Sequence, residues 1–536
     1  MHQPISYKEF TERHNLDYKP HQQQCVEWCL KQEGSPHQHG GLIADEMGLG
    51  KTIQIISLIN ANPLPTTLIV VPVALLAQWH EALIQLTPPN DPTQTIIYYH
   101  GSSRKKHTPP PPAPITTFSF RPQQNQTIIA LTTYGEISRP KSRTDRNPAS
   151  PIHSQEWSRI VFDEAHHLRN PNTNVHQSAL QLSSRIKWLL TGTPIQNSRR
   201  DFHALCEIIG IPSSLYKGDT IDLVTLTRNY IIKRTKQQLR IPMPELKEHV
   251  INVSWADSSE LELAKQLHTR IGMTKQQDSQ QHQQHKRVRL PEFSTKLVEY
   301  LRTRQLCILP GLVKDAFNQA LRDDAEYYRR QDNDDNQYND NDFPPPMTEE
   351  EFKETESFIA QATSGSSKLN AIVEHIIKDF GAFKKPSPSP SPSPSPSSTR
   401  RKLVFCEFRK EMDLLEESLI AKGVITGRID GGTPKNLKDA TIASPHIQVL
   451  LLQVRTCSEG LNLQQYSDIY IVTPQWNPTV EHQAIARSYR IGQTSTQVNV
   501  YRFVMEHDQL GLEQNIETKV IKTQEMKKEE AIQLMA

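Results

Sequence analysis

The sequence GGLIADEMGLGKT at residues 40–52 predicts a short apolar strand, a tight glycine-containing turn and the start of a helix. Backbone N–H groups of such a turn and of the helix N-terminus point at an anion, and the helix dipole adds a favourable field. Gly48 and Gly50 allow the backbone to wrap closely around phosphates. Lys51 supplies a positive charge for the β- and γ-phosphates, and Thr52 supplies a hydroxyl for Mg²⁺. The stretch therefore predicts a site for nucleotide phosphates and Mg²⁺.

This turn departs from the strict G-x-x-x-x-G-K-[ST] pattern, because Asp45 occupies the position of the first glycine. A glycine-rich turn before an ordinary helix is therefore the alternative interpretation. If the turn does bind phosphate, the candidate nucleotide-binding residues are Asp45, Glu46, Met47, Gly48, Leu49, Gly50, Lys51 and Thr52.

A second chemical signal lies at residues 157–170, WSRIVFDEAHHLRN. A predicted apolar strand ends there in two carboxylates. Asp163 is expected to hold Mg²⁺, directly or through water, and Glu164 to orient and deprotonate an attacking water. Open α/β sheets bind ligands at the carboxyl ends of their strands. Acidic residues are common at strand ends, so this acidic pair is a weak signal by itself. The preceding phosphate loop strengthens its interpretation as part of a nucleotide site.

Other polar residues lie beside predicted strands or helices. Gln22 has an amide that can both donate to and accept from an adenine edge, although an ordinary surface glutamine is the alternative. Thr132 and Thr133 end the predicted strand IIALTTY, where hydroxyls can meet a phosphate backbone, but β-branched residues are also common in strands. Thr191 and Thr193 in KWLLTGTPIQN are candidates for sensing the γ-phosphate, with a plain turn as the alternative.

Composition restricts the class of protein. A chain of 536 residues suggests about three to four domain-sized units. With 61 basic and 59 acidic residues, the formal net charge is +2, so any nucleic-acid surface must be local. The N-terminal MHQPISYKEFTERHN lacks the apolar core of a secretory signal, and the longest apolar runs are too short for a bilayer. We therefore expect a soluble intracellular protein without membrane partners.

Six mostly scattered cysteines favour a reducing compartment. Cys25 and Cys29, followed by His37 and His39, allow a zinc site as one interpretation. Their helical spacing with Trp28 favours packing in a hydrophobic core instead.

The composition changes after about residue 240. Residues 256–290 are predicted to be helical and are rich in Gln and His, whereas residues 331–346 are acidic and predicted to be disordered. A Ser-Pro repeat at 386–397 is interpreted as a solvated loop inside a second α/β unit, and its serines are candidate phosphorylation sites.

In that second unit, residues 479–493, TVEHQAIARSYRIGQ, predict a helix and its end. Gln483, Arg487 and Arg490 are spaced i, i+4 and i+7, so they are expected to share one helix face. Paired guanidiniums suit a terminal phosphate presented by another domain. A solvated basic face is the alternative interpretation.

Taken together in order, these stretches resemble the Swi/Snf-type DNA translocase family of helicase superfamily two. The matching stretches cover both halves of the chain outside the inserts and are KPHQ, DEMGLGKT, LIVVPVALLAQW, LTTY, DEAHHLRN, LLTGTPIQN, YIIKRT, KLVFCEF, EGLNL, PQWNP and QAIARSYRIGQ.

That resemblance implies an α/β fold of two RecA-like parallel-sheet lobes with helical and disordered insertions. The expected domains are an ATP-binding first lobe at 1–240, a helical insertion with the acidic tract at 241–365, and a second lobe at 366–536 that contains the Ser-Pro loop.

The same resemblance implies roles for residues of both lobes. Lys51, Glu164 and two arginine fingers, Arg487 and Arg490, would be catalytic. Gln22, Gly460 and Gln483 would join the phosphate loop in binding ATP, and Thr52 and Asp163 would hold Mg²⁺. The residues expected to contact DNA or to couple hydrolysis to movement are Thr132, Thr133, Thr191, Thr193 and Trp476.

Some positions depart from the family pattern. Gln453 stands where Ser is usual, Cys457 and Ser458 where small residues are usual, Thr473 where Asp is usual, His482 where Asp is usual, and Tyr489 where His is usual. None of these removes a phosphate-contacting group, so we expect ATP hydrolysis to be retained.

The expected function is an ATP-dependent duplex-DNA translocase or remodeller that acts in chromatin remodelling, DNA repair or transcription. Expected partners are duplex DNA, contacted through its phosphate backbone, and nucleosomes or other DNA-bound proteins. The expected location is nuclear, with a viral replication compartment as the alternative. A strand-separating helicase and an ATP-switched DNA-binding scaffold are the rival functions.

Overall fold

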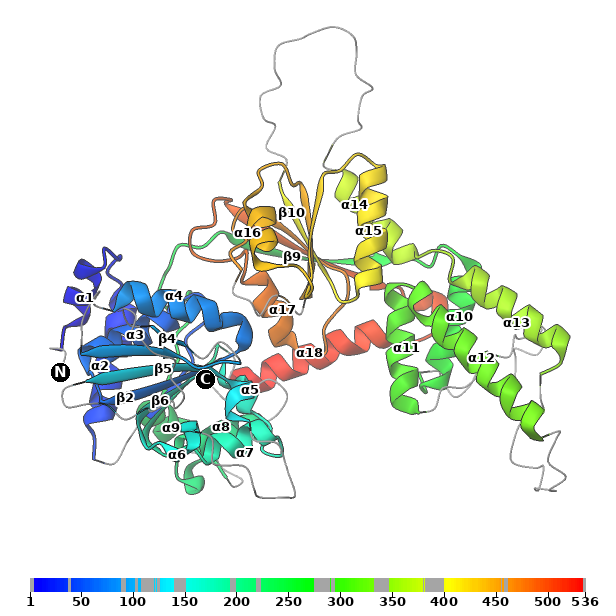
Figure 1. Ribbon diagram of the computed structural model, residues 1–536. Coiled ribbons are helices and arrows are strands. Elements are labelled where there is room, and N and C mark those ends of the chain that lie inside the picture. Colours follow the sequence, from blue (N-terminus) through cyan, green and yellow to red (C-terminus); the bar gives the residue numbers. More distant parts are fainter. Residues whose placement is uncertain are drawn as a thin grey trace, which may run out of the picture.

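Two parallel β-sheets, each covered by helices, organise the computed structural model (Figure 1). The structure describes residues 4–36, 40–87, 93–101, 105–107, 120, 122, 126–138, 151–192, 199–217, 223–273, 290, 295–331, 347–378, 380, 400–454, 456 and 461–533. We call the unit around the first sheet the first lobe and the unit around the second sheet the second lobe. The expected α/β fold of two parallel-sheet lobes is confirmed.

The first lobe contains eight strands in the order β4-β3-β5-β2-β6-β7-β1-β8, all parallel except for the β3–β4 pair. The strands are β1 Gly40–Ile43, β2 Thr66–Val71, β3 Gln94–Tyr98, β4 Lys105–His107, β5 Thr127–Thr133, β6 Trp157–Asp163, β7 Ser184–Leu190 and β8 Ile231–Ile232. Its helices are α1 Tyr7–Arg13, α2 Pro20–Gly34, α3 Lys51–Ala61, α4 Leu76–Leu86, α5 Tyr134–Ile137, α6 Pro151–Ser154, α7 Asn174–Leu180, α8 Arg199–Ile209 and α9 Leu223–Tyr230.

Continuous apolar runs form the central strands because both faces of the sheet are covered. Every residue of β2 is buried. Leu68 and Val70 point into one hydrophobic cluster, and Ile69 and Val71 point into another on the opposite face. Figure 1 shows α3 and α4 over one face of this sheet and α8 and α9 over the other.

The cysteines of α2 belong to this core. Cys25 and Cys29 are almost completely buried and pack in the cluster that also contains Ile55 and Trp79. Their position agrees with the packing interpretation of their helical spacing.

The second lobe contains six parallel strands in the order β11-β12-β10-β13-β14-β9. The strands are β9 Glu245–Val253, β10 Lys402–Cys406, β11 Thr426–Ile429, β12 Val449–Gln453, β13 Asp468–Ile471 and β14 Gln497–Met505. The helices after β9 are α10 Ser258–Arg270, α11 Lys296–Ile308, α12 Gly311–Gln331, α13 Glu349–Ala362, α14 Ser367–Lys378, α15 Arg409–Ala421, α16 Lys435–Ala443, α17 Pro478–Ile485 and α18 Ile516–Gln533.

The position of β9 differs from the expected domain division. Residues 245–253 were expected in a helical insertion, but they form an edge strand whose register with β14 runs from Glu245 to Val253. Helices α10–α13 share one hydrophobic cluster with this sheet, since Leu263, Leu306 and Phe317 pack together with Phe503. The second lobe therefore begins at β9, and the helices extend its core.

Helix α18 extends from the second lobe toward the first. Figure 1 shows it running from the region of α11, past α17, toward the first lobe. Near its end, burial lowers the pKa of Lys527, and the charges of Asp201 and Arg169 in the first lobe also act on it.

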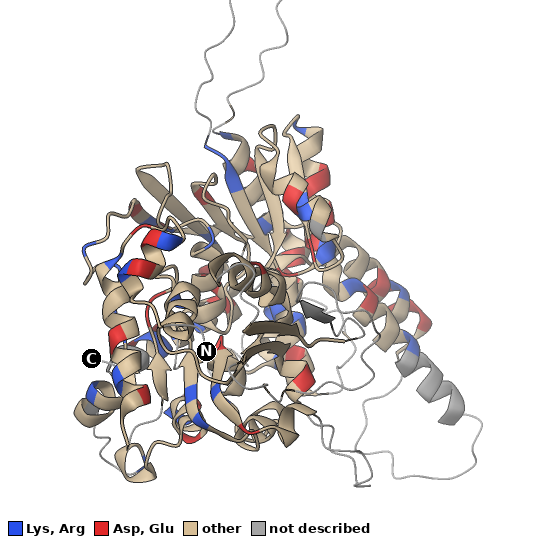
Figure 2. Cartoon of the chain, turned by 60° about the vertical axis from the view of Figure 1, so that its left-hand side comes forward, with Lys and Arg blue, Asp and Glu red and all other residues tan. Residues whose placement is uncertain are grey.

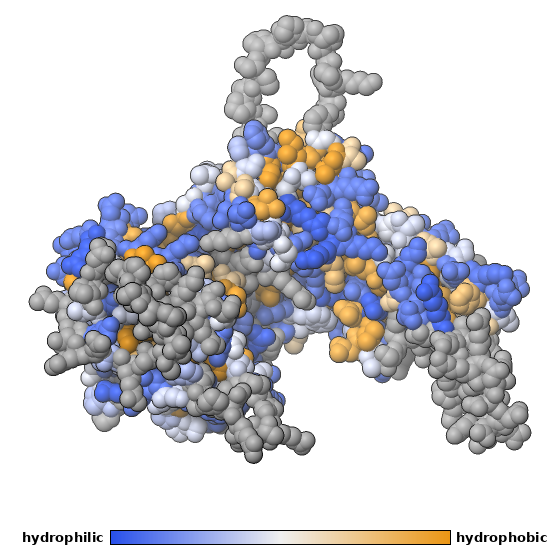
Figure 3. Space-filling view, viewed as in Figure 1, coloured by the Kyte–Doolittle hydropathy of each residue, from blue (hydrophilic) through white to orange (hydrophobic). Residues whose placement is uncertain are grey.

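The surface carries no single dominant charge. Figure 2 shows acidic and basic residues interspersed over the described elements, and Figure 3 shows a largely hydrophilic face with small groups of apolar residues. No helix in the described parts of the chain combines the length and apolar character needed to cross a membrane.

Candidate active site

The phosphate loop lies between β1 and α3 and depends on two glycines. Gly48 and Gly50 have φ angles of 89° and 84°, in the left-handed region that favours glycine. A Cβ at Gly50 would lie 2.2 Å from Nε2 of Gln22, so this position also lacks room for a side chain. Among the described residues, no side chain caps the N-terminus of α3. Its first N–H groups are therefore the kind of donors that bind an anion.

Lys51 crosses the loop, and Asp45 anchors it. The Lys51 Nζ donates to the backbone oxygen of Asp45 at 2.7 Å. The fully buried Asp45 carboxylate accepts hydrogen bonds from Gln54 Nε2 at 3.0 Å and from the Arg234 guanidinium, whose Nε lies 3.0 Å away. The residue that replaces the usual first glycine thus ties the loop to the segment that follows β8.

Gln22 is buried against the phosphate loop. Its Nε2 donates to the Leu49 oxygen at 3.0 Å, and its Oε1 accepts from the Tyr7 hydroxyl at 2.7 Å. The side chain therefore lies beside the loop, and both ends of its amide already have protein partners, so its contact with adenine stays a prediction.

The two acidic residues end β6, next to the loop. Asp163 accepts a hydrogen bond from Trp79 Nε1 at 2.6 Å and another from the Glu164 backbone N–H at 2.9 Å. Burial and the neighbouring Glu164 carboxylate raise the pKa of Asp163 to about 6, while Trp79 and Lys51 oppose this shift. A nearby divalent cation would favour the ionised form of such a group.

Glu164 is held differently. It has a φ of 49°, which is unusual for a residue other than glycine, and its Oε2 lies 3.2 Å from Nδ1 of His166. Burial acts to raise the pKa of Glu164, but the hydrogen bond and charge of His166, together with two more distant positive charges, outweigh burial and leave the pKa below the ordinary value. The charges of Lys51 and of Arg487 act in the same direction. Glu164 is thus held as a carboxylate, the form that can orient a water and accept its proton.

The influence of Arg487 on Glu164 brings the second lobe into this site. Helix α17 ends at Ile485, so the expected single helix face for Gln483, Arg487 and Arg490 is not formed. The chain leaves the helix because Leu463 N–H donates to the Arg487 oxygen and the Ser488 hydroxyl donates to the Tyr466 oxygen.

Both arginines nevertheless follow α17 closely. Burial lowers the pKa of Arg490, and within the described residues no carboxylate is paired with its guanidinium. Tyr489, between the two arginines, places its ring 5.5 Å from the Nζ of Lys236 in the first lobe. The segment 487–490 therefore faces the phosphate loop.

The described threonines lie at the carboxyl ends of strands β5 and β7 of the same sheet. Thr132 Oγ1 donates to the Tyr99 oxygen at 2.9 Å, and Thr133 Oγ1 lies 3.2 Å from His100 Nδ1. Thr191 is buried, and its N–H donates to the Ile43 oxygen at 3.1 Å, at the end of β1. Thr193 and Gly460 lie outside the described residues, as do Cys457 and Ser458.

Trp476 lies on the second lobe and is 38% exposed. Lys527 of α18 donates to its backbone oxygen at 3.1 Å. The preceding Gln475 is held by Glu481, which accepts its N–H at 2.7 Å, and by Gln524, whose Nε2 donates to the Gln475 oxygen. Trp476 is thus an exposed aromatic residue on a well-anchored loop.

Sequence reasoning missed four residues that contact this site. Trp79 and Tyr134 both donate to Asp163, the first to a side-chain oxygen and the second to the backbone oxygen at 2.7 Å. Arg234 and Lys236 hold Asp45 and Glu46. Arg234 lies in the YIIKRT stretch and Lys236 follows it directly, but the partners of these two residues could not be predicted from their spacing in the sequence.

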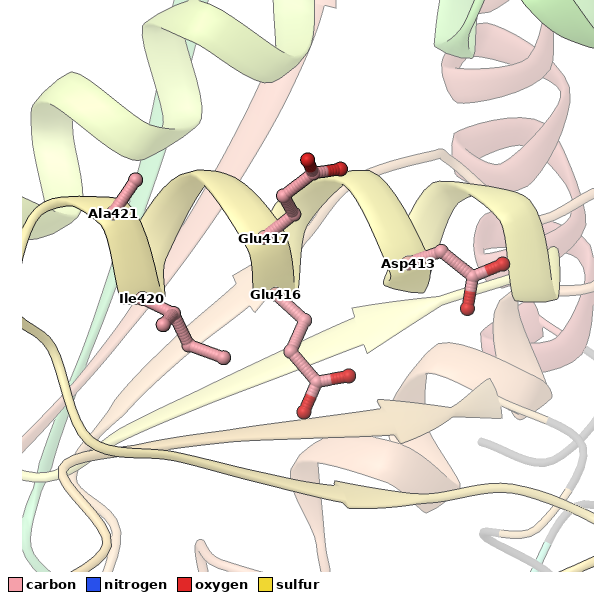
Figure 4. A pocket seen from close by; sticks show the side chains of 5 residues that line it. All are labelled: Asp413, Glu416, Glu417, Ile420 and Ala421. Carbon is pink, nitrogen blue, oxygen red and sulfur yellow. The ribbon is translucent and has the colours of Figure 1, made fainter.

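The residues fit ATP and Mg²⁺. Uncapped N–H groups and Lys51 suit phosphates, and the Thr52 hydroxyl and the Asp163 carboxylate are oxygen ligands of the kind that Mg²⁺ takes. By contrast, the hollow of about 540 Å³ on α15 is lined by Asp413, Glu416, Glu417, Ile420 and Ala421. Figure 4 shows Glu416 and Ile420 on one side of that helix and Glu417 on the other. Three carboxylates disfavour a nucleotide there.

Comparison with known proteins identifies both lobes. A family model described as "SNF2-related domain" matches residues 21–312, and one described as "Helicase conserved C-terminal domain" matches residues 395–492. The DNA repair protein RAD5 of Candida albicans is 27% identical, with 91% of this chain and 55% of the relative covered.

A probable global transactivator of Orgyia pseudotsugata multicapsid polyhedrosis virus is 24% identical and covers 91% of this chain and 86% of the relative. The chain spans about half the length of the first curated relatives that it matches. Among solved structures, the Sulfolobus solfataricus SWI2/SNF2 ATPase core in complex with dsDNA is 20% identical, with a TM-score of 0.36 and coverage of 91% of this chain and 88% of that chain.

Proposed function

This chain belongs to the SNF2-related domain family, and we propose that it is an ATPase that is stimulated by duplex DNA and moves along it. The observation that carries the proposal is the position of the arginine segment opposite the phosphate loop, with the Tyr489 ring 5.5 Å from Nζ of Lys236. Lys51 of the phosphate loop and Arg487 of the second lobe both act on the Glu164 carboxylate at the end of β6.

The chain's residues divide the work of hydrolysis. Lys51 and the first N–H groups of α3 would bind the β- and γ-phosphates, and Thr52 with Asp163 would hold Mg²⁺, which would neutralise phosphate charge. Glu164 orients the attacking water and accepts its proton, helped by its lowered pKa. Arg487 and Arg490 stabilise the charge that develops on the transferred group, a contribution typically worth about 10³–10⁵ in rate in related enzymes.

Movement along DNA follows if lobe closure depends on the nucleotide. The arginines are on one lobe and the phosphate loop is on the other, so binding of the triphosphate favours the closed arrangement and hydrolysis removes that preference. Contacts with the phosphate backbone of DNA would make the binding of DNA independent of its sequence and sensitive to salt. Trp476, exposed on its anchored loop, is the candidate coupling residue in the second lobe.

DNA repair is the process that the relatives favour, because one matched relative is named DNA repair protein RAD5. We propose a nuclear location on the same ground, and a viral replication compartment remains the alternative because one relative is viral. Nucleosomes and other DNA-bound proteins are the proposed obstacles that the chain displaces.

ATP hydrolysis by the purified chain tests the proposal, measured without DNA, with single-stranded DNA and with duplex DNA. Glu164→Gln is the matched control, since it keeps the size of the side chain and removes the base. We expect strong stimulation by duplex DNA in the wild type and none in the control. Stimulation mainly by single strands would favour a strand-separating helicase. Binding of ATP without hydrolysis would favour a DNA-binding scaffold.

A further inference from the structure

The segment that joins the two lobes is bonded to the phosphate loop. The oxygen of Ile232, the last residue of β8, accepts from Ala44 N–H at 2.7 Å, and beyond the strand the Arg234 oxygen accepts from Glu46 N–H at 2.9 Å. Together with the Arg234–Asp45 ion pair, these bonds make the start of the connection to β9 an extension of the nucleotide site.

Lys236 is the innermost side chain of this connection. It is only 5% exposed. Its Nζ lies 3.0 Å from Oε1 of Glu46, and its backbone N–H donates to Oε2 of the same carboxylate at 2.8 Å. The side chain also passes within 3.6 Å of where a Cβ of Gly48 would lie, so it runs along the phosphate loop.

The opposite side of the Lys236 ammonium meets the second lobe. The Tyr489 ring centroid is 5.5 Å from Nζ, within the range of a cation–π contact. Tyr489 lies directly between the segment's two arginines. Burial raises the pKa of Tyr489, and the Glu46 charge adds to the shift, which places Glu46, Lys236 and Tyr489 together across the lobe boundary.

We propose that Lys236 is a positioning residue that links Glu46 of the phosphate loop to Tyr489 and so sets the arginine segment against the nucleotide. This inference rests on the proposed function for its effect on hydrolysis but not for the contact itself. It also gives a physical reason for one departure from the family pattern. The phenol ring at position 489 presents a negative face to an ammonium group, whereas a protonated imidazole would repel it.

The lobe arrangement is tested first, without nucleotide. Spin labels are attached at Val73→Cys and Leu437→Cys, two exposed positions of which one lies on each lobe. The distance between the labels reports the distance between the lobes. The same 536-residue chain also carries Cys457→Ser, so that Cys457 is not labelled. The five cysteines known from the described residues are buried. We expect Lys236→Met to broaden or shift the distance distribution. Lys233→Met, in the same segment with an exposed side chain, is the matched control and should leave it unchanged.

Hydrolysis is tested second. Lys236→Met and Tyr489→Leu should each lower the duplex-stimulated kcat about three- to tenfold, the range expected for a partly desolvated cation–π contact, while Tyr489→Phe keeps the ring and stays near wild type. The double variant Lys236→Met/Tyr489→Leu should be no worse than the more severe single variant, because both remove one contact.

The outcomes distinguish a failure of the Lys236 inference from a failure of the proposed function. A distance distribution for Lys236→Met that matches Lys233→Met overturns the inference, and so do additive losses in the double variant. A shifted distribution in a chain whose wild type does not hydrolyse ATP supports the contact and removes the proposed function instead.

Discussion

At the scale of single residues, the acidic pair depends on a tryptophan from another helix. Trp79 of α4 donates to the Asp163 carboxylate, and this is one of the contacts that oppose the rise in the pKa of Asp163. A buried carboxylate oxygen that loses such a donor is typically left with a cost of about 1–3 kcal/mol. The strength of Mg²⁺ binding should therefore depend on a residue that does not touch the metal.

We expect Trp79→Phe to raise the Mg²⁺ concentration that gives half-maximal ATP hydrolysis about five-fold or more. Trp157→Phe is the control, because Trp157 is buried in the same lobe and donates to the Ile152 oxygen at 2.9 Å instead. Equal Mg²⁺ requirements in the two variants would mean that the Trp79 contact only supports the fold.

Arg234 provides a second prediction at this scale. Arg234→Gln leaves the fully buried Asp45 carboxylate without its charged partner, and breaking such a pair typically costs about 3–5 kcal/mol. Unfolding in urea, followed by tryptophan fluorescence, should show this loss. The double variant Asp45→Asn/Arg234→Gln should recover part of it, because no unpaired charge then remains. A double variant less stable than Arg234→Gln would argue against the pairing.

At the scale of elements, the start of α15 carries a buried acid. Glu411 Oε2 accepts the N–H groups of Glu407 and Phe408 at 3.0 and 3.1 Å. Within the described residues its other oxygen has no partner. Burial raises the pKa of Glu411 to about 7, so the folded protein holds this proton over a range in which the unfolded chain, with a pKa near 4.5, has lost it.

Stability should consequently fall as the pH rises from about 4.5 through about 7, because the folded state binds more protons there. Glu411→Gln keeps a neutral acceptor at every pH. We expect it to gain up to about 3 kcal/mol relative to the wild type between pH 5 and pH 8. Thermal unfolding at both pH values measures the difference. A constant gap between the two proteins would contradict the assignment.

Helix α18 supports the loop of Trp476 from behind. Gln524 Nε2 donates to Glu481 Oε1 at 2.7 Å and to the Gln475 oxygen. Gln524→Ala removes both bonds, so amide hydrogen exchange at residues 475–477 should become faster while exchange in β10 stays unchanged. Thr523→Ala is the control, because among the described residues the Thr523 hydroxyl donates to the Lys519 oxygen of the same helix at 2.8 Å.

At the scale of the whole molecule, the division between the lobes lies before β9. A fragment that starts at residue 366 lacks β9, which pairs with β14 at the edge of the sheet, and much of the hydrophobic cluster that contains Phe317 and Phe503. We expect a fragment of residues 241–536 to be soluble with cooperative unfolding and a fragment of residues 366–536 to aggregate. Circular dichroism and gel filtration of both fragments test the boundary. A well-folded shorter fragment would favour the division expected from composition.

Those features that depend on neighbouring residues could be predicted from the sequence. The phosphate loop and the DEAH stretch could be predicted because glycine geometry, strand hydrophobicity and acid placement act over a few neighbouring residues. The domain boundary was missed because β9, ELKEHVINV, has five charged or polar residues among nine and is recognisable as a strand only by its pairing with β14. The prediction of one helix face within residues 479–493 was wrong, because hydrogen bonds with Leu463 and Tyr466 hold the chain in a non-helical conformation after Ile485.

The sequence by itself determined the residue types of the nucleotide site, because these follow from motif chemistry along one stretch of chain, and the order of its motifs, through their resemblance to a known family, implied the two α/β lobes. Only the tertiary structure decided which distant groups meet there. Trp79 reaches Asp163, Arg234 reaches Asp45, and Lys236 lies between Glu46 and Tyr489. These contacts join residues far apart in the chain, and burial, which sets their strength, is a property of the packed lobes rather than of any single segment.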